Sequence, residues 1–358
     1  MRPGVRMQVE AGSENVLSFR RFLSAEISDC VSCFRQPFLS ADLLAEFILI
    51  HSRYQEEGDD LFPVVFLGES LQGVLTVAGG QDPIEIGSGG LTRSGVQQAF
   101  KRCAPLAADR AWAIFVILEE GVLRYGIFRT EQSPLRPTSF AKLRQARTDD
   151  ISVVGLVRMG MGFVEVRSSR GWFRYVNLTR EQEETENPRN VIQSFIEIVS
   201  RHCPAHLSGE LQSFYYRCGF DILQADHGTL LAVIDHRHGN PKIFDDGVSL
   251  SPRIEVVSMI EEILAENSNE AFLRLASFAL LLRKMTSMDG ITVVDSSGSI
   301  VGYNYFVRSA ALGARGETIP AGGARRRAFD ALCSHLGEDL LAVIYKSRDG
   351  AVEIGIAK

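Results

Sequence analysis

The stretch GGARRRAF, residues 322–329, combines residue types that suit the binding of an anion. Two glycines allow the backbone to approach a ligand closely, and the helix that follows offers free N–H groups and the positive end of its dipole. Arginine can pair two phosphate oxygens at once through its planar guanidinium. We therefore expect a phosphate site here, although a solvated basic face is the common alternative. Its residues would be Gly322, Gly323, Arg325, Arg326 and Arg327.

The charge around this stretch differs from that of the whole chain. The full sequence has a net charge of −6, yet residues 308–327 contain five arginines and one acid, Glu317. A net acidic chain is not a general nucleic-acid or membrane-surface binder, because such binding needs net basicity or a long basic stripe. The local excess of arginine instead indicates a bound anion at one site.

A second candidate is the stretch TSMDGITVVD, residues 286–295. Asp289 and Gly290 lie where an amphipathic helix pattern meets an apolar strand pattern. A carboxylate at such a junction can hold a divalent cation together with a neighbouring phosphate. Taken alone, Asp-Gly is also a common turn pair.

The order of elements predicts an α/β (α+β) protein of two domains. In the first half, strands are expected at 63–67 and 73–79, a capped helix at 92–104, and hairpins at 111–128 and 151–178, which together make a mostly antiparallel sheet. In the second half, a mixed sheet flanked by helices is expected. Its elements are a strand at 227–235, helices at 255–267 and 270–285, a hairpin at 290–307, a helix ending near 336, and a hairpin at 340–357.

The polar stretch TREQEETENPRN, residues 179–190, is the best domain boundary. We expect an N-terminal domain at 1–187, a linker helix at 188–204 and a C-terminal domain at 205–358. The 358 residues are enough for two cores.

Other features of the sequence point to the cytoplasm. No apolar run is long enough to span a bilayer, and the first residues lack the apolar segment of a secretory signal. The six cysteines are scattered rather than dense, which fits a reducing compartment.

The succession of motifs in residues 205–358 resembles the diadenylate cyclase domain of the DNA-integrity scanning protein and its membrane-anchored relatives. That family carries Asp-Gly-Ala, then Gly-Thr-Arg-His-Arg-Ala-Ala, then a hairpin preceded by Val-Ser-Glu. Here the corresponding segments are MDGITVVD, GGARRRAF and LLAVIYKSRDGAVEIGI. The N-terminal domain is similar in general plan to the sensor domains that accompany such cyclases.

The resemblance implies that two ATP molecules in two facing domains condense to cyclic di-AMP and pyrophosphate, in a homodimer regulated by the N-terminal domain. Asp289 would bind Mg²⁺ or Mn²⁺ and help to activate the attacking hydroxyl. Arg325 and Arg327 would clamp phosphates as catalytic groups, while Gly290 and Ser347 would lie near the nucleotide. Metal and cations stabilise the charge that develops in phosphoryl transfer.

Several positions depart from the family pattern. Arg326 replaces the family His, Ala324 replaces a Thr, and Ile291 replaces an Ala. Lys346 and Ser347 stand where the family has Ser and the metal-contacting Glu. The alternatives are therefore a cyclase-like domain that binds a nucleotide as a sensor or effector without turnover, and a scaffold that binds no ligand.

Other possible sites are less favoured. His236 and His238 are two residues apart but fit the tip of a strand, and Cys30 and Cys33 fit a helix core rather than a zinc site. The segment HCPAH, residues 202–206, fits a helix end, and Asp245-Asp246-Gly247 fits a loop.

Overall fold

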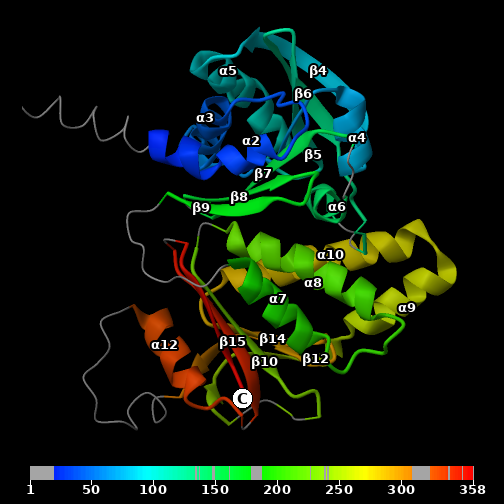
Figure 1. The fold of residues 1–358 in the computed structure, drawn as a ribbon. Coiled ribbons are helices and arrows are strands. Elements are labelled where there is room, and N and C mark those ends of the chain that lie inside the picture. Colours follow the sequence, from blue (N-terminus) through cyan, green and yellow to red (C-terminus); the bar gives the residue numbers. More distant parts are fainter. Residues whose placement is uncertain are drawn as a thin grey trace, which may run out of the picture. The chain divides into compact units, whose positions relative to one another are not determined.

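A computed structural model of the chain describes residues 20–133, 135–136, 138–146, 150–160, 162–178, 188–225, 227–237, 239, 242–308, 323–337, 339–348 and 350–357. The protein is mixed α/β, as the sequence predicts, with two seven-stranded sheets (Figure 1). The chain divides into two compact units, each with one of these sheets. Unit 1 comprises Met1–Glu131 and Thr138–Thr179, and unit 2 comprises Gln132–Pro137 and Arg180–Lys358.

The sheet of unit 1 has the strand order β4-β6-β5-β3-β7-β8-β9. Only the β3–β5 pair of these neighbours is parallel, which confirms the expected mostly antiparallel sheet. Its strands are β3 (Val65–Gly68), β4 (Gln81–Gly90), β5 (Trp112–Glu119), β6 (Val122–Arg129), β7 (Val153–Gly160), β8 (Phe163–Ser168) and β9 (Phe173–Asn177), and a separate small ribbon joins β1 (Gln55–Glu56) to β2 (Asp59–Asp60).

Helices cover both faces of this sheet. Helices α2 (Ser28–Ser32), α3 (Ala41–His51) and α5 (Arg93–Cys103) contribute to one apolar core with the sheet, and the short 3-10 helix η1 (Ala104–Ala107) follows α5. Helices α4 (Leu71–Ala78) and α6 (Ser139–Gln145) contact each other and strand β7, and α4 also contacts β3. The helix expected at 92–104 is confirmed, because the Thr92 hydroxyl accepts a hydrogen bond from Gly95 N and caps α5.

The strand expected at 73–79 is wrong, because these residues belong to helix α4. Ser70 caps the helix by accepting a hydrogen bond from Gly73 N, and Gly79 ends it in the left-handed conformation at φ 62°. These two caps outweigh the preference of the β-branched residues for a strand. Strand β6 pairs with β5 on one side, as the expected hairpin requires, and with β4 on the other side, a strand that the sequence does not predict.

The sheet of unit 2 has the order β11-β14-β13-β10-β15-β16, with β12 also paired to β14. Strands β10 and β13 at its centre run parallel, and β15 runs antiparallel to β10. Gly298 and Gly350, both with positive φ, lie in the two expected hairpin turns. The strands are β10 (Thr229–Ile234), β11 (Phe244–Asp245), β12 (Val248–Ile254), β13 (Ile291–Asp295), β14 (Ile300–Val307), β15 (Leu340–Lys346) and β16 (Val352–Ile356).

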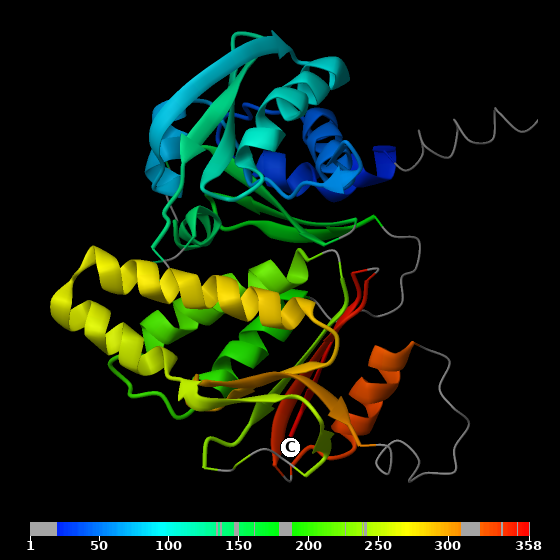
Figure 2. The same cartoon turned by 180° about the vertical axis from the view of Figure 1, so that it is seen from behind.

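The sheet of unit 2 has a layer of helices on one face and the single helix α12 on the other (Figures 1 and 2). One layer contains α7 (Pro188–Val199), α8 (Ser208–Leu223), α9 (Val256–Glu266) and α10 (Asn269–Ser287). On the other face, α12 (Ala324–Cys333) buries Phe329 and Leu332 against apolar side chains of the strands. The expected helices near 255–267, 270–285 and 322–336 are thus confirmed, whereas α8 is not predicted. Among the described residues, none of the helices has the length and apolar character that crossing a bilayer requires.

Candidate functional site

A pocket of about 460 Å³ lies at the start of α12. Its wall comes from the residues before β10 and β13, the end of β14, the end of β15 and the first turns of α12. Parallel strands place their beginnings at the same edge of a sheet, which explains why segments far apart in the sequence meet here. Its lining includes Gly228, Asp289, Gly290, Gly323, Arg325, Arg326 and Ser347.

Asp289 and Arg325 face each other in this pocket. Arg325 donates a hydrogen bond from Nη2 to Asp289 Oδ1 at 2.6 Å, and their side chains are 35% and 86% exposed respectively. Arg325 reaches the carboxylate by passing over Gly228, where a Cβ would lie 3.3 Å from both Arg325 Cδ and Nη1. The sequence analysis does not single out Gly228, and its signal would have been a glycine directly before a buried strand.

Gly290 has the left-handed conformation with φ 93°. A Cβ at this position would lie 2.8 Å from Tyr305 O and 2.9 Å from two backbone atoms of Asn304. Only glycine accepts both the dihedral angle and this close approach of β14. Gly290 therefore sets where the chain enters β13 and so where Asp289 lies.

The first turn of α12 presents backbone N–H groups, which are hydrogen-bond donors, at the pocket. Gly323 is the N-cap and has no side chain to bond the N–H groups of the first turn, which leaves them available to a ligand. A Cβ on Gly323 would meet nothing within 4 Å, so the surroundings are open. Gly322, the other glycine of the expected phosphate site, lies outside the described residues.

The three consecutive arginines diverge in the structure. Arg325 points to Asp289, whereas Arg326 donates from Nε to Asp330 Oδ1 at 3.1 Å and also pairs with Glu353 on β16. The Arg326 guanidinium also lies 5.6 Å from the ring centre of Tyr345. Arg327 is exposed and lies outside the described lining of the pocket. The expected clamp of Arg325 and Arg327 is therefore not formed on one pocket wall.

Ser347 lines the pocket but is also part of the β15–β16 turn. Its Oγ accepts a hydrogen bond from Ala351 N at 2.9 Å. The preceding Lys346 is buried and donates from Nζ to Ala225 O at 2.6 Å and to His227 O at 2.9 Å. The ammonium of Lys346 thereby joins the end of β15 to the segment before β10.

The lining combines charge with apolar surface. Phe306 is 46% exposed at the end of β14, and Ile291 and Leu230 form further apolar wall. Arg348 at the β15–β16 turn adds a cation that the sequence analysis missed. Of the described lining residues, Asp289 alone carries a carboxylate, against the four cations Arg325, Arg326, Lys346 and Arg348. The pocket therefore suits an anionic ligand that also has an apolar part.

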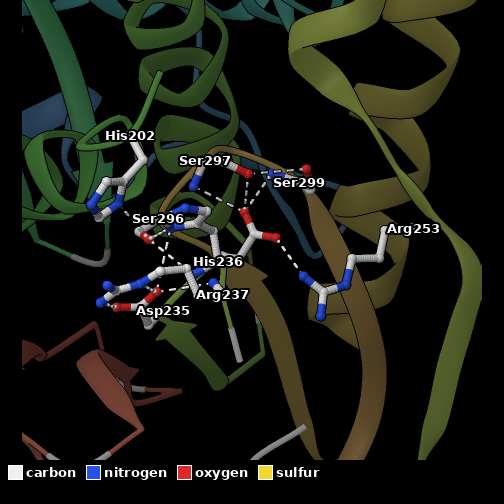
Figure 3. Close-up of polar contacts among 9 residues, drawn as sticks. His202, Asp235, His236, Arg237, Arg253, Ser296, Ser297 and Ser299 are labelled. Atoms are coloured by element: carbon white, nitrogen blue, oxygen red, sulfur yellow. Dashed lines mark hydrogen bonds and ion pairs between the residues drawn. The ribbon is translucent and has the colours of Figure 1, made fainter. Parts of the chain in front are cut away.

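The opposite end of the same sheet carries a dense polar network (Figure 3). Asp295, at the end of β13, accepts hydrogen bonds from Ser297 N, Ser297 Oγ and Ser299 N, and pairs with Arg253 Nη1 at 2.9 Å. Nearby, Asp235 at the end of β10 pairs with Arg237. Hydrogen bonds from Arg237 hold the pKa of the Asp235 carboxyl well below its usual range.

Two histidines lie side by side in this network. The ring centres of His202 and His236 are 4.2 Å apart, and His202 Nδ1 lies 2.9 Å from Ser296 Oγ (Figure 3). Burial first and the neighbouring His236 second lower the pKa of His202. His238 lies outside the described residues. Within the described ranges, His, Cys, Asp and Glu residues form no group of three that could hold a metal ion.

The remaining candidates have structural roles. Cys30 is buried in the core of unit 1, and burial raises the pKa of its thiol, as does the adjacent Cys33. His202 follows the end of α7 as expected. Asp245 ends strand β11 and pairs with Phe306, so the expected loop is confined to Asp246 and Gly247, which both have positive φ. Comparisons with protein-family models, with curated proteins and with solved structures found no match to this chain.

Proposed function

We propose that unit 2 binds ATP in the pocket at the start of α12 and acts as a nucleotidyltransferase of the diadenylate cyclase type. The observation that carries this proposal is the convergence of Asp289, Gly290, Arg325 and Ser347 on one pocket. These residues come from three separate segments, and each segment corresponds to one motif of the resemblance. Unit 1 would tune the activity of unit 2.

The chemistry of the pocket supports a nucleoside triphosphate as the ligand. Arg325 and the open first turn of α12 suit phosphate oxygens, and the apolar wall with Phe306 suits a planar base. A volume of about 460 Å³ also lies in the range of small-molecule sites.

In the proposed reaction, the 3′-oxygen of one ATP attacks the α-phosphorus of another. The bond from that phosphorus to the bridging oxygen of the β-phosphate breaks, pyrophosphate leaves, and the hydroxyl proton passes to solvent water. A second reciprocal step closes the ring of cyclic di-AMP. Because each chain holds one ATP, a second copy must present the attacking hydroxyl, so the active form would be a face-to-face homodimer. Arg325 would stabilise negative charge on the phosphates.

Asp289 would hold Mg²⁺ or Mn²⁺ together with triphosphate oxygens. One carboxylate plus substrate phosphates is a sufficient protein contribution for Mg²⁺, so the residues present fit such an ion. When bound, the ion neutralises charge on the phosphates. Arg325 must then exchange the Asp289 carboxylate for a phosphate oxygen.

The test is to incubate the full chain with ATP and Mn²⁺ or Mg²⁺ and to search for cyclic di-AMP by mass spectrometry. We expect a product that is lost in Arg325→Ala and retained in Arg327→Ala, because Arg327 lies outside the described lining. A wild-type chain that forms no cyclic dinucleotide with either metal would contradict the proposal.

A second candidate function is nucleotide binding without turnover. Two observations favour it: Asp289 is paired with Arg325, and Arg326 is held by Asp330 and Glu353. Both pairings reduce the groups that act on a reacting phosphate. Calorimetry that measures ATP binding while the ATP stays intact would select this function.

A further inference from the structure

One side of helix α10 is exposed although it carries three leucines. Leu273 is 69% exposed and Leu280 is 59% exposed, and Leu281 beside them is exposed as well. Successive residues of a helix are about 100° apart, so these leucines lie on the same side as Ser277, whereas the buried side chains of α10 lie on the other side. Single exposed leucines are common, but three along one side of a helix form an apolar patch that indicates a binding partner.

The exposed side of α10 also has charges at its two ends. We define the α10 stripe by its six exposed residues, Glu270, Leu273, Ser277, Leu280, Leu281 and Lys284. Glu270 lies in the first turn of the helix and Lys284 in the last turn, and Ser277 lies midway between them. The Ser277 hydroxyl donates a hydrogen bond to Leu273 O at 2.8 Å, so this residue needs no further partner. The stripe is therefore evenly spaced about Ser277 and opposite in charge at its two ends.

We propose that the α10 stripe binds the α10 stripe of a second copy of this chain, with the two helices antiparallel and a two-fold axis at Ser277. A two-fold interface requires a surface that is complementary to itself. About this axis, Glu270 of each copy faces Lys284 of the other, and Leu273 of each copy faces Leu281 of the other. A parallel pair would instead place like charges together, which is repulsive. The charge pattern therefore selects a second copy in the antiparallel orientation.

Two further side chains fit a close pair of helices. Ser277 is small, which lets the two helices approach to the distance of about 8–10 Å that is typical of packed helices. Arg274 would face Leu280 of the second copy. Its guanidinium donates from Nη1 to Glu262 Oε2 on α9 at 2.8 Å, so its charge is balanced within its own chain and its apolar stem can cover the leucine.

This interface is separate from the pocket at the start of α12. The described lining of the pocket contains no residue of the α10 stripe, so this association differs from the face-to-face dimer of the proposed reaction and needs no nucleotide. One pair of helices makes a small interface, below about 1,200 Å², so we expect a dissociation constant of about 1–100 μM.

The experiment is sedimentation of the full chain without nucleotide, at concentrations from about 1 to 200 μM, to measure the dimer dissociation constant. Lys284→Glu places carboxylates opposite each other at both ends of the stripe, so it should weaken the dimer about tenfold or more. The double variant Glu270→Lys with Lys284→Glu exchanges the charges and should return to within about threefold of the wild type. Arg283→Glu is the matched control. It reverses the charge of the adjacent exposed residue, which lies about 120° around the helix from Ser277, and should change the constant by less than about threefold.

A disulfide across the two-fold axis tests the register. In Ser277→Cys, a mild oxidant should join two copies, because two thiols on the axis are close enough for an S–S bond. Ser258→Cys, at an exposed position on α9, is the control, and the wild type reports the background from the native cysteines.

Three results would overturn the inference. A wild type that stays monomeric at about 200 μM would mean that something other than a second copy covers the stripe. A dimer that Lys284→Glu leaves unchanged would use another surface. Ser277→Cys that forms no more covalent dimer than Ser258→Cys would contradict the antiparallel register. None of these measurements depends on ATP, so they are independent of the outcome of the cyclase assay.

Discussion

The carboxylates at the two ends of the sheet in unit 2 differ in exposure and in the number of their hydrogen-bond partners. At the end where β10 and β13 begin, the Asp289 side chain is 86% exposed and pairs with Arg325. At the end where these strands finish, the Asp295 side chain is 2% exposed and has Arg253 and three further hydrogen-bond donors. A buried carboxylate that accepts several hydrogen bonds from the protein stabilises the fold. A carboxylate with one exchangeable partner beside a pocket can serve a ligand.

The position of the pocket also differs from the common arrangement. Ligands of open α/β sheets usually bind beyond the carboxyl ends of the parallel strands. In unit 2 the turn of residues 295–299 and the side chains around Asp235 occupy that end. The start of α12 instead borders the other end, where Gly228 gives Arg325 room to pass and Gly290 lets β14 come close to the chain beside the pocket.

Replacing each of the two aspartates with asparagine should give the largest difference in unfolding free energy between the two ends of the sheet. Asp295→Asn puts an amide among donors and removes the charge that pairs with Arg253, so we expect unit 2 to lose about 2–4 kcal/mol of unfolding free energy. Asp289→Asn should change it by less than about 0.5 kcal/mol. Hydrogen exchange of β10 and β13 peptides across a urea series measures both.

Tryptophan fluorescence provides the control for this measurement. Both tryptophans, Trp112 and Trp172, belong to unit 1, so their unfolding signal reports unit 1 alone. It should be unchanged in either variant. Equal losses for the two substitutions would mean that exposure and the number of donors do not distinguish the two carboxylates.

The next largest effect is expected at Gly290. In Gly290→Ala the new Cβ would lie 2.8 Å from Tyr305 O at a φ of 93°. We therefore expect the unfolding free energy of unit 2 to fall by about 2–3 kcal/mol. Gly323→Ala, at φ −66° with nothing within 4 Å, should cost less than about 1 kcal/mol. The same exchange assay compares the two. A Gly290→Ala variant that loses as little unfolding free energy as Gly323→Ala would indicate that β13 and β14 can separate at the pocket.

Much of the fold of unit 2 is predictable because its signals are local. The helix stripes near 255–285 and the turns at Gly298 and Gly350 need only the sequence around them. Helix α4 is mistaken for a strand because the caps at Ser70 and Gly79 matter more than its β-branched residues. A cap is one residue long, and a periodicity argument easily overlooks it.

The candidate site is predictable only in part, since it depends on long-range contacts. The sequence indicates Asp289, Gly290 and an arginine cluster, and the structure brings Asp289, Gly290 and Arg325 to one pocket. The sequence does not indicate that Arg326 pairs with Glu353, which lies 27 residues away. The divergence of the arginines depends on what β15 and β16 present to α12, and no local pattern contains that information.

A smaller effect is expected at the Arg326–Glu353 pair, which lies between the two extremes of exposure. Both side chains are about one third exposed, at 35% and 33%. Glu353→Gln should therefore weaken the packing of α12 by about 0.5–1 kcal/mol, as measured by hydrogen exchange of α12 peptides. The charge-swapped double variant Arg326→Glu with Glu353→Arg should recover part of the loss. No recovery would mean that Asp330 and the rings of Tyr345 and Phe329, rather than Glu353, hold the arginine.

The smallest effect is a pH dependence at the network end of the sheet. Burial and then His236 lower the pKa of His202 below 6.5, with Arg201 and Arg237 acting in the same direction and Asp235 opposing them. The unfolded chain thus binds a proton more readily than the folded one as the pH falls below 6.5. Stability is intact above that pH and falls towards pH 5, by less than about 0.5 kcal/mol because His202 is exposed and solvent screens the charges.

Urea midpoints of unit 2 at pH 7 and pH 5 should differ less in His202→Asn than in the wild type, whereas the exposed His206→Asn should keep the wild-type difference. A His202→Asn variant with the full pH dependence would assign it to other groups, such as the carboxylates that are buried at this end.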